Sequence, residues 1–249
     1  MEIATFNLEK DLLGQGYHFV IGTDEVGRGP LAGPVVACAV ALKEFPKVQP
    51  SEKVEPSCDG KMWDLVRDSK MLSEKQREKA FDFIHEHFHV GIGLCDHHTI
   101  DRINILEASF LSMKKAIQEL RRDMERETQN AKREMRNPEE ENQKRSTLHA
   151  PRFIILVDGN KKIPNLSMEQ MAVIGGDKIV KSISAASIVA KVTRDRMMAD
   201  FHRKYPQYGL DKHKGYGTMA HMIALEKYGP CEIHRKSFGP VARLANLKK

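Results

Sequence analysis

Four acidic residues occupy positions from which a folded chain can bring their carboxylates together. Asp24 and Glu25 follow one apolar run, Asp158 follows another, and Asp195 lies on the apolar side of a predicted helix. Gathered carboxylates repel each other and persist only with positive charge among them, and all-oxygen ligation favours Mg²⁺ or Mn²⁺ over zinc. We therefore expect a site for two such ions, which would clamp the attacking and leaving oxygens of a phosphoryl displacement.

Asp195 has a second interpretation. A helix is predicted from residue 185 to about residue 204, and spacings of 3 and 4 give it one inward stripe: Ala185, Ile188, Val192, Asp195 and Ala199. A carboxylate on such a stripe must be paired or bound to a metal. A salt bridge to Lys191, one turn earlier, is the alternative to metal binding, and the sequence leaves both open.

The stretch G-T-D-E-V-G-R-G-P-L-A-G-P-V-V (22–36) also invites a phosphate-binding interpretation. Arg28 and Gly29 stand where a nucleotide-binding loop needs Lys and a hydroxyl residue. The dinucleotide fingerprint needs a helix to follow, but a β-branched run follows here. Neighbouring strand residues point to opposite faces, so Asp24 and Glu25 share a site only if the chain bends at Glu25, or if Glu25 acts through its carbonyl or a water.

Other chemistries fit less well. Histidines cluster at 85–89 and at 97–98; the first cluster is more typical of a solvated helix end than of a transition-metal site. No G-x-S-x-G elbow is present. A ribonuclease that uses a histidine pair and the 2′-OH of RNA needs no metal, but it would leave the inward Asp195 unexplained.

The elements that must position these groups alternate in type. Apolar patterns predict the strands 17–23, 34–42, 90–94 and 153–157, and helices at 73–87, 104–120 and 185–204. The helix at 73 begins with capping-box spacing, Ser73 to Gln76. We expect a mixed α/β sheet flanked by helices, with an antiparallel start and a parallel later strand.

Two segments are predicted to lie outside this framework. Residues 43–62 are expected to form a loop. Residues 121–150 contain fifteen charged and five apolar residues, so we expect an insertion that continues the preceding helix into solvent or is disordered, and cannot build a core. Replacing residues 123–147 by a short Gly/Ser loop should then leave folding and activity nearly unchanged.

The composition bounds the class of protein. The chain has 249 residues and a net charge of +6, and residues 191–249 hold 13 Lys and Arg against 5 Asp and Glu. That basic region suggests a polyanion partner, although a solvated surface would look the same. Four scattered cysteines indicate a reducing compartment. We expect a cytoplasmic protein with no signal peptide and no membrane span, organised as a single domain over 1–249 with a basic, helical C-terminal region at about 200–249.

Six short blocks resemble type 2 ribonuclease H, ribonuclease HII. They occur in order: the 22–36 stretch quoted above, R-D-S-K-M-L-S (67–73), V-D-G-N (157–160), S-A-A-S-I-V-A-K-V-T-R-D-R (184–196), H-K-G-Y-G-T (213–218) and H-R-K-S-F-G-P-V (234–241). The resemblance implies an RNase H-like fold that hydrolyses the RNA strand of RNA–DNA hybrids. It also implies incision 5′ of single ribonucleotides in duplex DNA, which leaves a 3′-hydroxyl and a 5′-phosphate.

The resemblance also implies residue roles. It places the acidic quartet of the family on Asp24, Glu25, Asp158 and Asp195. It makes Gly27, Arg28 and Gly29 the loop that senses the ribose 2′-OH, Tyr216 the tyrosine under the next sugar, and Lys70 a phosphate contact. The alternative is a non-catalytic nucleic-acid-binding protein with a degenerate site. No obligate protein partner is predicted.

Overall fold

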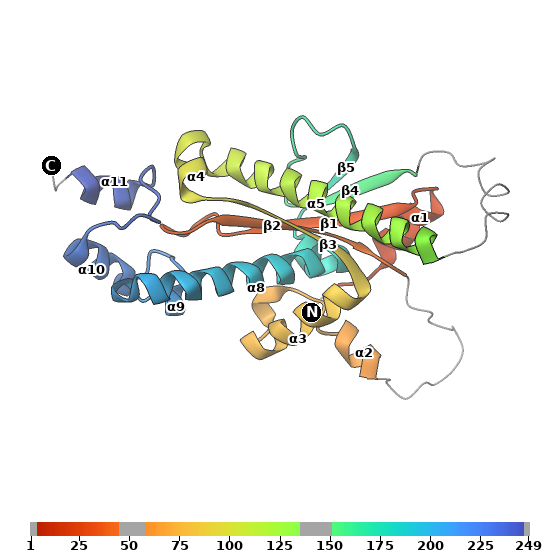
Figure 1. The fold of residues 1–249 in the computed structure, drawn as a ribbon, viewed down its shortest axis with the longest axis horizontal. Helices are drawn as coiled ribbons and strands as arrows, with labels where there is room; N and C mark the ends of the chain where they lie inside the picture. Colours follow the sequence, from red (N-terminus) through yellow and green to blue (C-terminus); the bar gives the residue numbers. More distant parts are fainter. Residues whose placement is uncertain (1–3, 45–57, 135–150, 247–249) are drawn as a thin grey trace.

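A computed structural model describes residues 4–44, 58–134 and 151–246, and Figure 1 shows their arrangement. Five strands form one sheet in the order β3-β2-β1-β4-β5. Their bounds are β1 Phe19–Val26, β2 Val35–Leu42, β3 Phe88–Cys95, β4 Phe153–Asp158 and β5 Glu169–Val173. The pairs β1–β2 and β2–β3 are antiparallel, whereas β1–β4 and β4–β5 are parallel. The predicted mixed sheet with an antiparallel start is confirmed.

Two long helices cover opposite faces of the sheet, as Figure 1 shows. They are α5, Ile105–Glu134, and α8, Lys181–Lys204. Strand β2 is apolar throughout because both of its faces are buried. Its residues 36, 38 and 40 pack in a cluster with α8, and residues 37, 39 and 41 in a cluster with α5.

Glycines in β3 allow α5 to lie close to the sheet. A Cβ at Gly91 would lie 2.1 Å from the carbonyl oxygen of Ala116, and one at Gly93 would lie 2.1 Å from that of Ser112. Neither distance is possible for a real side chain, so only glycine permits this contact.

The remaining helices complete the two layers and the C-terminal region. They are α1 Asn7–Gly14, α2 Cys58–Trp63, α3 Glu74–His87, α4 His97–Ile103, α7 Gly176–Ile179, α9 Leu210–His213, α10 Met219–Tyr228 and α11 Gly239–Asn246, with 3-10 turns at Ser69–Met71 and Pro206–Tyr208. The predicted capping box starts α3: Gln76 N–H donates to Ser73 Oγ, and Ser73 N–H donates to Gln76 Oε1. Among the described residues, no helix is long and apolar enough to cross a membrane.

Two expectations about the segments outside the framework need correction. Residues 58–62, expected in a loop, belong to α2, while 45–57 lie outside the described residues. Helix α5 continues to Glu134, as one of the two alternatives for this segment predicted, but Met124 is buried in the cluster that α5 forms with the sheet, so the first part of the segment does not run into solvent. Nδ1 of His89, in β3, lies 3.4 Å from Oδ2 of Asp123 and 3.3 Å from Oε2 of Glu127. The start of the proposed insertion therefore packs on the sheet; 135–150 are outside the described residues.

Met124→Ala is expected to lower the free energy of unfolding by about 2 kcal/mol, because it removes a buried side chain at the end of the α5 cluster. Urea unfolding measures this loss. Glu125→Ala, an exposed position in the same turn, is the matched control. Equal stability of the two variants would place Met124 outside the core and restore the expectation that this segment is dispensable.

Candidate active site

The parallel pairing of β1 with β4 brings two of the predicted carboxylates together. Thr23 pairs with Val157, so the next residues, Asp24 and Asp158, stand side by side where β4 ends and its pairing with β1 stops. Asp24 is buried, and its carboxylate accepts from Glu25 N–H at 2.7 Å. The β-branched runs that form these strands thus determine where the carboxylates meet.

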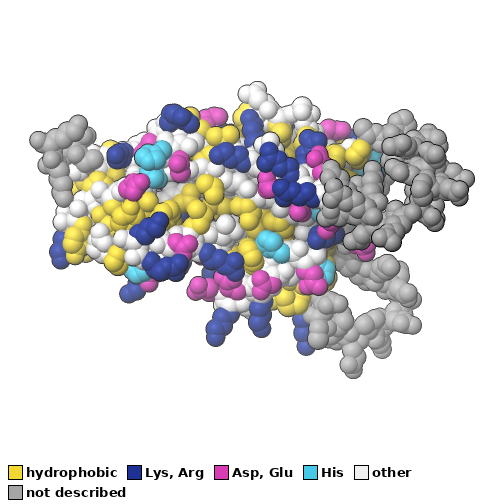
Figure 2. Space-filling model, viewed as in Figure 1, with side chains coloured by type: hydrophobic (Ala, Val, Ile, Leu, Met, Phe, Trp, Pro, Cys, Tyr) yellow, Lys and Arg dark blue, Asp and Glu magenta, His cyan; other side chains and the backbone are white. Residues whose placement is uncertain are grey.

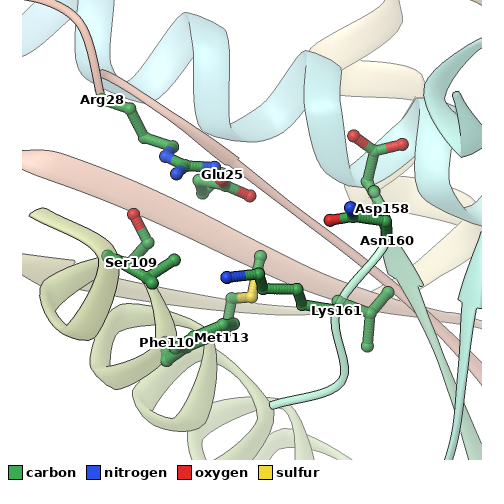
Figure 3. A pocket seen from close by; sticks show the side chains of 11 residues that line it. Glu25, Arg28, Ser109, Phe110, Met113, Asp158, Asn160 and Lys161 are labelled. Atoms are coloured by element: carbon green, nitrogen blue, oxygen red, sulfur yellow. Dashed lines mark hydrogen bonds and ion pairs between the residues drawn. The ribbon is translucent and has the colours of Figure 1, made fainter. Parts of the chain in front are cut away.

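Glu25 lies on the other side of β1 from Asp24. The strand continues to Val26 without the bend considered above. Asp24 interacts with Ser187 of α8, whereas Glu25 lines a pocket of about 150 Å³ on the α5 side. Figure 3 shows Glu25 and Arg28 on one side of this pocket and Asp158 on the other. Asp158 is close enough to both acids of β1 for its charge to raise the pKa of each.

Asp177, which the sequence analysis missed, joins this cluster. It lies in the first turn of α7, and its N–H donates to Asp158 Oδ1 at 3.2 Å. Its carboxylate forms a 3.1 Å ion pair with Lys70 Nζ. Although partial burial opposes the charged form, the hydrogen bond and charge of Asp177 raise the pKa of Lys70. Asp177 follows Gly175 and Gly176 just after β5, so predicting that edge strand would have drawn attention to it.

Asp195 is not part of the cluster that the structure assembles. Lys191 Nζ lies 2.7 Å from Asp195 Oδ1, so the salt-bridge alternative describes this conformation. Asp195 lines a separate pocket between α3 and α8. The predicted stripe fails in its second half because the buried positions shift to Arg194 and Met198, where α8 leaves the sheet for the C-terminal region.

Burial and mutual repulsion disfavour the charged form of these carboxylates. Burial raises the pKa of Asp24 well above its ordinary value, and the charges of Glu25 and Asp158 add to the effect. Burial also raises the pKa of Glu25, although Arg28 opposes this. Burial and then Asp177 raise that of Asp158. A cation among these groups would remove the repulsion.

The donor set suits a hard divalent cation. Within the described ranges, no three His, Cys, Asp or Glu side chains are already arranged to hold a metal. Mg²⁺ does not require such a cage, since proteins usually bind it through one or two carboxylates, waters and substrate phosphates. The all-oxygen cluster with raised pKa values therefore fits Mg²⁺ or Mn²⁺.

Asp24→Asn is expected to raise the melting temperature at neutral pH in the presence of a chelator. The pKa of Asp24 is raised in the folded state, so wild-type stability falls as pH rises from about 4, the unfolded value, towards the folded one. Asn has no charge, so its advantage should grow over that range and vanish at about pH 4. Thermal melts from acid to neutral pH test this. A variant that is less stable at neutral pH would contradict the repulsion.

The predicted Gly27-Arg28-Gly29 loop stands beside the carboxylates. Gly27 has a φ of +97°, and a Cβ there would lie 2.3 Å from Arg194 Nε. Arg28 forms a 3.2 Å ion pair with Glu25. A Cβ at Gly29 would lie 3.5 Å from Cε1 of Tyr216, whose side chain is 43% exposed. The glycine loop and Tyr216, which are distant in the sequence, thus lie next to each other at the surface.

Two fully buried arginines hold this loop. Arg235 donates to the carbonyl oxygens of Gly27, Arg28 and Gly33 at 2.6, 3.1 and 3.0 Å. Arg194 donates to those of Ala32, Pro34 and Lys214 at 3.2, 3.0 and 3.0 Å.

Burial lowers the pKa of Arg235 to about 9 and that of Arg194 to about 10. From the sequence, both arginines belong to the basic C-terminal region and to quoted blocks of the resemblance, but neither was given a role. Their hydrogen bonds stabilise the loop in the shape that presents Gly27 to Gly29.

Comparison with solved structures shows the class of fold. The structure aligns with ribonuclease H2 from Pyrococcus horikoshii OT3 at a TM-score of 0.59, with 24% identity, over 92% of this chain and 98% of the other. It aligns with Bst-RNase HIII in complex with Mn²⁺ at a TM-score of 0.58, with 18% identity, over 93% of this chain and 70% of the other. The fold is that of the type 2 and type 3 ribonucleases H.

The sequence comparisons are more specific. The sequence model described as Ribonuclease HII matches residues 21–241. Ribonuclease HII of Caldicellulosiruptor bescii is 42% identical over 234 residues, which cover 94% of this chain and 92% of that protein. The chain therefore belongs to the ribonuclease HII family, and it is an endonuclease that hydrolyses the RNA strand of RNA–DNA hybrids. The alternative of a non-catalytic binding protein is not favoured.

Proposed function

We propose that the enzyme also incises duplex DNA on the 5′ side of a single embedded ribonucleotide, and leaves a 3′-hydroxyl and a 5′-phosphate. The observation that carries this proposal is the Asp24–Asp158 pair just beyond the last paired residues of two parallel strands, next to a glycine loop that faces an exposed tyrosine. The first feature supplies phosphodiester chemistry, and the second supplies a surface that can distinguish one sugar from the next.

Asp24, Glu25, Asp158 and Asp177 are the proposed metal ligands. Bound Mg²⁺ or Mn²⁺, two ions in the active complex, would supply positive charge for the transferring phosphoryl group and lower the pKa of water. The protein itself holds the carboxylates at fixed positions. Lys70 is mostly exposed and sits beside the acids, so it can turn from Asp177 to a substrate phosphate.

Substrate recognition is assigned to the loop and the tyrosine. Close approach of the sugar to the backbone of Gly27, Arg28 and Gly29 would allow hydrogen bonds to the ribose 2′-OH, the group that distinguishes RNA from DNA. Tyr216, across from Gly29, would stack on the following deoxyribose.

Affinity would come from Lys and Arg contacts with phosphates. On the face drawn in Figure 2, Lys and Arg are distributed among Asp and Glu and do not form one block. A nucleic acid bound to that face would therefore be held by separate contacts between single Lys or Arg side chains and phosphates.

Gly29→Val and Tyr216→Ala test this assignment on two substrates, a duplex with one embedded ribonucleotide and a continuous RNA–DNA hybrid. Tyr216→Ala should lose about 1–3 kcal/mol of transition-state stabilisation, by analogy with base–aromatic stacking. The loss should be larger on the single-ribonucleotide duplex, because only that junction places a deoxyribose against the ring. Equal losses on both substrates would refute the junction role of Tyr216.

Gly29→Val should lower the cleavage rate more than Tyr216→Ala on both substrates, because the valine methyl groups would fill the space between the loop and the tyrosine. Gly29→Ala is the matched control, since a Cβ at this position makes only an ordinary van der Waals contact with Tyr216. An active Gly29→Val enzyme would refute the close-approach argument.

A further inference from the structure

Two buried histidines connect the C-terminal segments with Tyr216. His221 lies in the first turn of α10 and His234 in the segment before α11, and both are fully buried. Their Nε2 atoms are 3.1 Å apart. Burial lowers the pKa of both rings, that of His234 to about 4, so both are neutral at neutral pH. Each ring therefore has one hydrogen-bond donor and one acceptor.

The partners at the two ends determine which nitrogen carries each proton. The Tyr216 carbonyl can only accept, so His221 Nδ1–H donates to it at 2.9 Å and His221 Nε2 remains an acceptor. His234 then donates from Nε2–H, and its Nδ1 accepts from Cys231 N–H at 3.0 Å. The Cys231 carbonyl, 3.3 Å from this Nδ1, accepts instead from His234 N–H. The chain runs in one direction, from the backbone of Cys231 to that of Tyr216.

The backbone around Tyr216 is held from a second side. Its carbonyl also accepts from Thr218 N–H at 2.8 Å. His213 stacks on His221 with 4.5 Å between ring centroids, and its Nδ1 accepts from Gly215 N–H at 3.2 Å. The phenol ring is exposed, so the position of the ring against Gly29 depends on how the backbone beneath it is held.

We propose that His221 and His234 are positioning residues for sugar selectivity, which act by holding the Tyr216 carbonyl and thereby the distance between its ring and Gly29. This inference rests on the proposed sugar-reading role of Tyr216. Neither histidine touches the substrate, and both contribute through one directional hydrogen-bond chain. Reversing or breaking its last link should weaken discrimination between a single embedded ribonucleotide and continuous RNA.

The two amide replacements of His221 separate the links of the chain. His221→Asn retains an N–H at the place of Nδ1, and so the bond to the Tyr216 carbonyl, but it loses the acceptor for His234. His221→Gln retains an acceptor at the place of Nε2 but loses the donor to Tyr216. Asn is the smaller side chain and leaves the larger cavity, so a purely structural role would make it the more damaging replacement.

The measurement is the ratio of kcat/KM on the single-ribonucleotide duplex to kcat/KM on the continuous hybrid. We expect His221→Gln to lower this ratio at least about threefold, as for one lost neutral hydrogen bond, and His221→Asn to preserve it within about twofold. Melting temperatures should follow the opposite order. An Asn variant that loses as much selectivity as the Gln variant, or a Gln variant that loses none, would overturn the proposal.

Two further readouts separate this inference from the role of Tyr216 itself. Amide hydrogen exchange at Thr218, which shares the Tyr216 carbonyl, should accelerate in His221→Gln and not in His221→Asn, without any substrate present. Tyr216→Ala reports the sugar-reading role directly. Unchanged exchange in His221→Gln would contradict the positioning. An unchanged ratio in Tyr216→Ala would refute the sugar-reading role, and with it the link to selectivity, whatever the exchange shows.

Discussion

Asp158→Asn is expected to abolish cleavage of an RNA–DNA hybrid while hybrid affinity stays within a few-fold of wild type. Asp158 interacts electrostatically with both Asp24 and Glu25, and it accepts a hydrogen bond from Asp177 N–H, so loss of its charge affects the whole cluster. Affinity should change little because it depends mainly on cationic contacts with phosphates. Single-turnover cleavage in saturating Mg²⁺ and a binding titration in chelator measure the two effects.

A variant that retains more than about a tenth of the wild-type rate would remove Asp158 from the site, since tenfold corresponds to about 1.4 kcal/mol, far below the effect of losing a metal ligand. Asp200→Asn on the exposed side of α8 is the matched control for loss of one negative charge. It should cleave at close to the wild-type rate.

Asp177→Asn is expected to lower the cleavage rate far more than Asp195→Asn. Asp177 is a proposed ligand, buried beside Asp158 and Lys70, so its loss should lower the cleavage rate by at least about 100-fold, which is the upper end of the effect for groups that only support metal ligands. Asp195 is paired with Lys191 at the rim of another pocket, so its loss should cost less than about tenfold.

The same rate assays, performed across a range of Mg²⁺ concentrations, decide between the two acids. Asp177→Asn should also shift the Mg²⁺ dependence to higher concentration, whereas Asp195→Asn should leave it unchanged. The opposite ranking would show that α8 supplies the fourth carboxylate after a rearrangement that breaks the Lys191 ion pair.

Much of the site could be predicted from acidic residues that directly follow apolar runs. The runs before Asp24 and Asp158 are apolar enough to predict buried strands, and the parallel pairing of those strands then brings the two acids together. Asp177 was missed because β5 is a short, half-exposed edge strand whose sequence, E-Q-M-A-V, does not alternate between polar and apolar residues. The helical wheel predicted that Asp195 points inward with the apolar residues of the helix. It could not predict which element that side of the helix faces, and Asp195 lies at the pocket between α3 and α8, not at the carboxylate cluster.

Other features have no local signal in the sequence. Arg194 and Arg235 look like members of a basic region, and only the folded chain shows that backbone carbonyls surround them. Met124 lies in a segment so rich in charge that a core position was not expected there. In each case the partner is distant in the chain, and composition over a short window does not report it.

The most direct test of the central account uses the purified protein, a duplex with one embedded ribonucleotide and the all-DNA duplex of the same sequence. With Mg²⁺, we predict one cut on the 5′ side of the ribonucleotide, with a 3′-hydroxyl and a 5′-phosphate at the new ends, and no cut in the all-DNA duplex. With chelator, neither duplex should be cut. Cleavage that persists in chelator, products that carry a 2′,3′-cyclic phosphate, or cutting of the all-DNA duplex would contradict the account.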